Sequence, residues 1–159
     1  MEKEIKAVYE EWSFARYNTK VFVEFLNKTD SNYILNRPGL DSTKKHFNEM
    51  IDIQNAYISA LQTKILSYEN TLSNDEYSDA SSYDAILMNM ETSDEKMKNI
   101  LETMTENDYV FSDGEKKSIV AHICALISHE MFHIGQLIGF CYAQNLEIPD
   151  EIREMWALS

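Results

Sequence analysis

Apolar residues recur every three or four positions along four long stretches of the chain, which is the spacing of one face of an α-helix. The stretches run from about Glu2 to Asn27, Ser42 to Tyr68, Ser81 to Thr105 and Asp113 to Asn145. The inward positions, in that order, are Ile5, Val8, Trp12, Ala15, Thr19, Phe22 and Leu26; His46, Met50, Ile53, Tyr57 and Leu61; Tyr83, Leu87, Met90, Met97, Leu101 and Met104; and Ile119, His122, Leu126, His129, His133, Leu137 and Phe140. We therefore predict four amphipathic helices.

The segments between these stretches carry turn and capping residues. "NRPGLDS", residues 36–42, breaks the chain, and Asp41 or Ser42 would cap the second helix. "ENDYVFSDGE" reads as an extended connection, and Ser112 with Glu115 fits a capping box for the last helix. Connections of about ten residues exceed the shortest hairpin loops, so the helices need not alternate up and down. The pattern predicts an all-α four-helix bundle.

Length and charge narrow the class of protein. The 159 residues, 44% of them hydrophobic, favour a single domain over residues 1–159, and four glycines and two prolines are too few for an all-β fold. A net charge of −13 argues against binding to nucleic acid or to an anionic membrane surface. With no run of roughly 18 apolar residues and no signal peptide, we expect a cytoplasmic protein that does not span a membrane.

Two cysteines, Cys124 and Cys141, lie on the last predicted helix. They would be about 25 Å apart along the helix axis, which is too far for a disulfide. Their expected role is that of small buried hydrophobic residues in a reducing compartment.

All four histidines fall on inward positions, and two of them form the pattern His129-Glu130-x-x-His133. Imidazoles four residues apart on a helix point the same way, so both can reach one metal ion. His46 is the remaining inward histidine outside the last helix and is our third predicted ligand, whereas Glu49 is expected to point off the inward stripe. His122 would lie about 10.5 Å from His129 along the axis, too far to share one ion. We interpret it as a core or supporting residue.

The same five residues also fit H-E-x-x-H, the zinc-peptidase signature in which the glutamate is the general base. A third ligand would then have to come from Glu147, Glu151 or Glu154, within a short tail. Nothing in the chain reads as the edge strand that would align a peptide, and His46 would be unexplained. We therefore give Glu130 a supporting or surface role.

The stretch "HEMFHIGQL" resembles the H-E-x-x-H-x-G-Q element of the DinB-like superfamily of small bacterial metalloproteins. An early histidine in the second helix, here His46, and a closing proline followed by a tryptophan, here Pro149 and Trp156, extend the similarity over most of the chain. The resemblance implies an up-down-down-up four-helix bundle, a three-histidine site of His46, His129 and His133, and a homodimer. The family's frequent arginine after the second histidine is replaced by Ile134.

Characterised relatives in that family include transferases that use bacillithiol, mycothiol or glutathione. We expect a divalent metal, zinc or nickel, and a small-molecule thiol of the bacillithiol kind that attacks a small electrophile in stress or detoxification. No serine or cysteine nucleophile accompanies the histidines, so a thiolate or water at the metal would carry the reaction. The alternatives are a metal-dependent hydrolase, a non-enzymatic metal-binding stress protein, and a bundle whose histidines are core residues without a metal.

Overall fold

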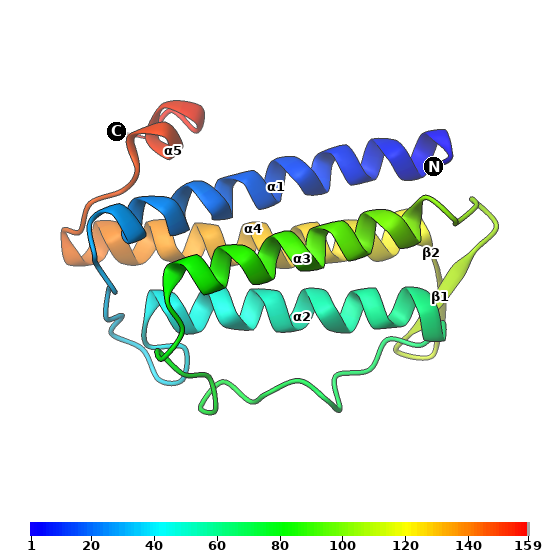
Figure 1. Ribbon diagram of the computed structural model, residues 1–159, viewed down its shortest axis with the longest axis horizontal. Coiled ribbons are helices and arrows are strands. Elements are labelled where there is room, and N and C mark those ends of the chain that lie inside the picture. Colours follow the sequence, from blue (N-terminus) through cyan, green and yellow to red (C-terminus); the bar gives the residue numbers. More distant parts are fainter. Residues whose placement is uncertain (159) are drawn as a thin grey trace.

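Four long helices make up most of the computed structural model, which describes residues 1–158 (Figure 1). They are α1 (Lys3–Lys28), α2 (Thr43–Thr63), α3 (Tyr83–Leu101) and α4 (Ile119–Gln144). The remaining elements are an antiparallel hairpin of β1 (Tyr109–Ser112) and β2 (Glu115–Ser118), and a short helix, α5 (Asp150–Met155). The fold is therefore mostly helical, as the apolar periodicity predicts.

The long helices lie side by side, with α1 and α4 running one way and α2 and α3 the other way (Figure 1). Helix α1 packs against α3 and α4, and α2 packs against the same two helices. Because α2 and α3 are parallel, the chain between them, residues 64–82, must return along the length of α2 before α3 begins (Figure 1).

The predicted apolar faces form the core. Every inward position predicted for the first helix is buried, and so are most of those on the other three. Ile53, Leu87, His129 and Phe140 are partly exposed, because they lie at the edges of the helix contacts. Two apolar clusters fill the interior, one around Phe22, Phe47 and Leu137 and the other around Trp12, Ile58 and Leu126.

Helix α2 ends five residues before the predicted Tyr68. Lys64 takes a left-handed conformation (φ 65°), which stops the helix. The next residues then bond to β1: Phe111 N donates to the Lys64 carbonyl (2.8 Å), and Leu66 N donates to the Phe111 carbonyl (2.9 Å). Hydrogen bonds from a distant segment thus replace the last predicted turn.

Helix α4 begins at Ile119, not at the predicted Asp113, and its cap is Ser118, whose side chain accepts from Ala121 N. The predicted capping box is therefore wrong. Asp113 and Gly114 both have positive φ (52° and 77°) and form the turn of the β-hairpin. Asp-Gly is a favoured pair for that turn, and this was the sequence signal that the prediction missed.

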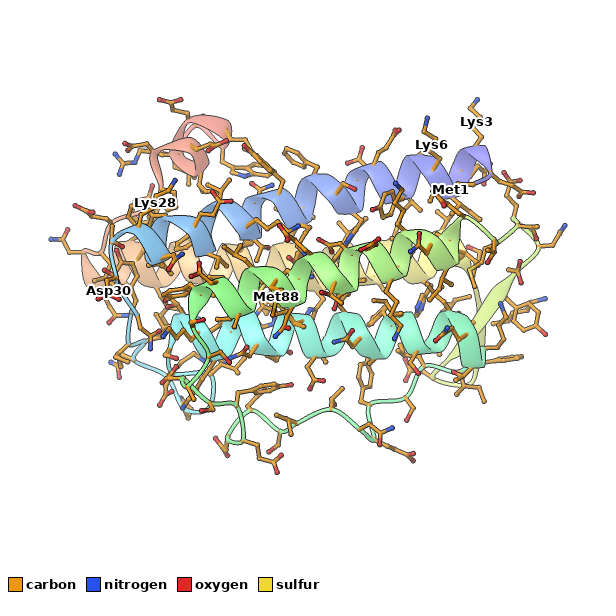
Figure 2. The ribbon with its side chains drawn as sticks, viewed as in Figure 1. Met1, Lys3, Lys6, Lys28, Asp30 and Met88 are labelled. Atoms are coloured by element: carbon orange, nitrogen blue, oxygen red, sulfur yellow. The ribbon has the colours of Figure 1, made fainter. Side chains whose placement is uncertain are left out.

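The outer face of α4 carries no charge. Glu130 is the one Asp, Glu, Lys or Arg residue of α4 and is fully buried, whereas Lys3, Lys6 and Lys28 of α1 point outward (Figure 2). By length and composition alone, α4 is long and apolar enough to cross a membrane. A central helix of a packed core passes the same test, and the inner face of α4 is packed against α1 and α2.

Candidate metal centre

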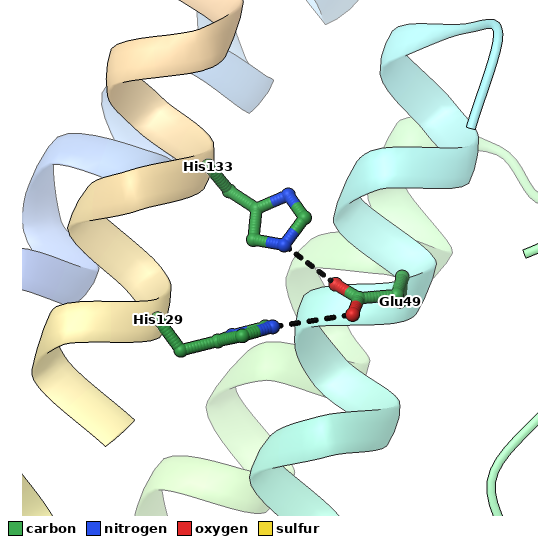
Figure 3. A group of neighbouring side chains, drawn as sticks. All are labelled: Glu49, His129 and His133. Atoms are coloured by element: carbon green, nitrogen blue, oxygen red, sulfur yellow. Dashed lines mark hydrogen bonds and ion pairs between the residues drawn. The ribbon is translucent and has the colours of Figure 1, made fainter. Parts of the chain in front are cut away.

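Helices α2 and α4 bring together Glu49, His129 and His133, and one ligand atom from each lies within 4.8 Å of the others. The Glu49 carboxylate reaches from α2 toward both imidazoles of α4 (Figure 3). His129 Nε2 lies 3.2 Å from Glu49 Oε1, and His133 Nε2 lies 3.1 Å from Glu49 Oε2. The three side chains form a group that could hold a metal ion.

The local sequence explains this placement. His129 and His133 are one helical turn apart on α4, and their ring centroids are 4.5 Å apart. Ser42 caps α2 by accepting from Lys45 N, which fixes where that helix starts and places Glu49 two turns into it. Both helices are therefore rigid supports for the side chains they present.

Glu49 is predicted to point off the inward stripe and is not among the predicted ligands, yet it reaches both imidazoles of α4. Glu49 is only 8% exposed and lies between α2 and α4. The imidazole pair sits toward the edge of the contact between these helices, since His129 is only partly buried. A ligand from α2 must therefore come from a position to the side of the central stripe. The spacing His46-x-x-Glu49 could have indicated this, because residues three apart share a helix face.

His46 is fully buried beside His133, with their Nδ1 atoms 3.0 Å apart. Its ring meets that of His133 edge-on, with centroids 5.2 Å apart. His46 is not part of the group whose ligand atoms all lie within 4.8 Å of one another. Of the three predicted histidines, His129 and His133 belong to the group, and His46 only touches His133 from outside it. The role of His46 as a ligand stays a prediction.

Burial keeps the inner histidines neutral. It lowers the pKa of His133 to about 4, with the nearby Glu49 carboxylate acting in the opposite direction. Burial also lowers the pKa of His46 to about 4, and the positive charge of Arg37 adds to the effect. Neutral imidazole is the form that binds metal ions, so at neutral pH neither side chain has to lose a proton first.

His122 is a core residue, as predicted. It is buried, and its ring stacks on Tyr57 with centroids 4.6 Å apart. Its Nε2 atom lies 3.0 Å from the Tyr57 carbonyl oxygen. Burial lowers the pKa of this histidine as well. His122 therefore has its own partner on α2.

Glu130 lies in the interior, which excludes the surface role considered from the sequence. It is fully buried, accepts a hydrogen bond from Thr19 and lies 3.1 Å from Arg16 Nη1. Burial raises the pKa of this carboxyl, and Arg16 partly offsets that rise. Because Glu130 is engaged with α1, it is not placed as the general base that the peptidase motif requires. Its position favours a supporting role.

Arg37 brings a positive charge near the histidines from the loop that precedes α2. Its Nη1 atom donates to Gln136 Oε1 (3.0 Å), one turn beyond His133 on α4. Among the described residues no carboxylate lies within ion-pair distance of Arg37, although Arg16 has two such partners and Arg153 has one. Ile134, at the position where the DinB-like element often has arginine, is buried in the core.

The donor set of Glu49, His129 and His133 fits a divalent metal. Two imidazole nitrogens and one carboxylate oxygen are ligands that zinc accepts, and three protein ligands leave a position open, as in catalytic zinc sites. Imidazole also suits nickel, so the residues do not select one ion. In comparisons with known proteins, no family model and no curated protein matches the chain.

Proposed function

We propose that the protein is a DinB-like, divalent-metal-binding four-helix bundle of the cytoplasm that transfers a low-molecular-weight thiol to a small electrophile, in stress or detoxification. The observation that carries this proposal is the group of Glu49, His129 and His133. The up-down-down-up course of the long helices supports it (Figure 1), together with the H-x-G-Q element that follows His129.

Glu49, His129 and His133 would hold a zinc or nickel ion between α2 and α4. A bound divalent ion would lower the pKa of a thiol that reaches the open position. In the transfer, the thiol sulfur forms a bond to an electrophilic carbon, and the bond from that carbon to its leaving group breaks. The leaving group departs with the electron pair, and the thiol proton passes to solvent.

The protein's own cysteines are poor nucleophiles for this reaction. Cys141 is buried, and burial raises the pKa of its thiol to about 11. Cys124 is exposed on the outer face of α4, more than one helical turn from His129. A small external thiol is therefore the better source of sulfur.

The charge beside the site favours an anionic thiol. The Arg37 guanidinium donates to Gln136 through Nη1 and to the Pro38 carbonyl through Nε, which leaves further N–H groups able to donate to a ligand. An arginine that lacks a carboxylate partner is suited to bind a carboxylate or phosphate of a ligand. The free donors of Arg37 support an anionic co-substrate such as bacillithiol. Arg37 would supply the positive charge that the DinB-like element often has at the position of Ile134.

The proposed reaction is tested by incubating zinc-loaded or nickel-loaded protein with monochlorobimane and, separately, bacillithiol, glutathione or cysteine. We expect the fluorescent conjugate to form faster than in protein-free controls and chelation to abolish the difference. Consumption of ester or amide substrates with water alone would favour a hydrolase instead. If metal-loaded protein accelerates neither reaction, the transferase is refuted and the non-enzymatic binding protein is favoured.

Replacing Arg37 with glutamine is expected to raise the KM for an anionic thiol by about 10-fold or more, because a charge-assisted hydrogen bond is lost. The kcat should change little, since Arg37 lies beside the metal group rather than in it. Arg153→Gln is the matched control: Arg153 lies on α5 and pairs with Asp150. Equal KM values for Arg37→Gln and the wild type would show that Arg37 does not bind the thiol.

A further inference from the structure

The two ring nitrogens of His133 face two different partners. Nε2 lies 3.1 Å from Glu49 Oε2, on the side where His129 also points. Nδ1 lies 3.0 Å from Nδ1 of His46. The two nitrogens of one imidazole point in divergent directions, so the ring can give only one of them to a given ion.

From this geometry we infer that His46 is a positioning residue for His133 and not a metal ligand. The inference rests on the proposed metal centre of Glu49, His129 and His133. With Nε2 of His133 given to the metal, its Nδ1 carries the proton and donates to Nδ1 of His46. His46 in turn carries its proton on Nε2, a buried nitrogen that has no hydrogen-bond partner among the described residues. The contact therefore selects the tautomer of His133 that leaves Nε2 free to bind.

The surroundings of His46 suit this role. The residue is fully buried one turn before Glu49 on α2, so one helix supplies both the carboxylate and the outer partner of His133. The edge-on packing of the two rings, with an interplanar angle of 74°, limits rotation of His133. A second histidine partner of this kind is absent for His129, whose Nδ1 atom has no hydrogen-bond partner among the described residues. His133 is thus the more firmly oriented of the two imidazoles.

This assignment differs from the one implied by the DinB-like resemblance, in which His46 is a ligand. A site of three histidines would need ligand atoms of His46, His129 and His133 near one point. The group that does meet contains Glu49 in place of His46. The two assignments predict different numbers of imidazoles around the metal, so they can be separated by experiment.

The test compares His46→Asn, which keeps an acceptor close to the position of Nδ1, with His46→Leu, which removes it. We expect zinc affinity, measured by competition with a chromophoric chelator, to stay within about threefold for asparagine and to fall roughly 10–100-fold for leucine. X-ray absorption of the zinc-loaded wild type and both variants should show two imidazole ligands throughout. The control is His122→Phe, which replaces a buried histidine outside the metal group. It should match the wild type in both measurements.

Three imidazoles in the wild type and two in both variants would overturn the inference and make His46 a ligand. An unchanged zinc affinity in His46→Leu would overturn the inference as well, because the His46 contact would then not be needed to orient the His133 ring. If His46→Leu does not fold, the imidazole count in His46→Asn decides between the assignments on its own. A wild-type protein that binds no zinc or nickel would instead refute the metal centre on which the inference depends.

Discussion

Replacing Arg16 with leucine is expected to lower the free energy of unfolding by about 3–5 kcal/mol, because a buried carboxylate would lose its charged partner. Arg16 of α1 is 2% exposed and reaches all three other long helices. Its guanidinium lies 3.1 Å from Glu130 on α4 and 3.4 Å from Asp94 on α3, and it donates to Gln54 on α2 (2.7 Å). The guanidinium also stacks over Trp12, 4.8 Å from the ring centroid.

The loss is measured by urea unfolding followed by circular dichroism, with a chelator present so that metal binding does not contribute. Arg16→Leu combined with Glu130→Leu should recover much of the stability, because no buried charge is then left unpaired. Lys6→Ala is the matched control: Lys6 forms an exposed pair with Glu10 at 3.7 Å, and its loss should have no measurable effect. If Arg16→Leu is as stable as Lys6→Ala, this buried network does not stabilise the fold.

Replacing His133 with alanine is expected to remove the bound metal. The purified protein should carry about one equivalent of zinc or nickel, because the described residues contain one group of suitable ligands. Losing His133 leaves two ligands, and we expect the affinity to fall by more than about 100-fold, since even the loss of an outer partner costs 10–100-fold. Metal content after dialysis, measured by mass spectrometry, reports the result.

The control for this variant is His122→Phe, which removes a buried histidine from the same helix and keeps a ring against Tyr57. That variant should retain the full equivalent of metal. A His133→Ala protein that also retains it would show that the ion binds elsewhere. A wild-type protein purified without metal, which also takes up none on loading, would show that the histidines are core residues only.

The number of long helices and their inner faces could be predicted, because burial of one face imposes a period that single residues reveal. Trp12 and Leu126 are buried where the period places them. Two helix ends could not be predicted in the same way. Lys64 stops α2 where β1 offers hydrogen bonds from far along the chain, and the Asp113-Gly114 turn shifts the start of α4. The end of α2 depends on a pairing between distant segments, whereas the start of α4 was marked locally by the Asp113-Gly114 turn.

The candidate site could be predicted in part for the same reason. His129 and His133 are one turn apart on one helix, so their alignment needs no tertiary information. Glu49 became apparent only when the position of α2 beside α4 was known, and the burial of Glu130 depends on Arg16 of α1. The ligand role of His46, the thiol, the homodimer and the cytoplasmic location stay predictions.

The placement of Glu49 and His129 on different helices has a consequence for chain entropy. These two residues are 80 positions apart, and the segment between them contains the return along α2, all of α3 and the β-hairpin. A cross-link between their side chains would close a loop of that length in the unfolded chain. By the estimate used for disulfides, closing such a loop is worth about 4.5 kcal/mol. An ion bound by these ligands would therefore hold α2 against α4, in addition to any chemistry at its open position.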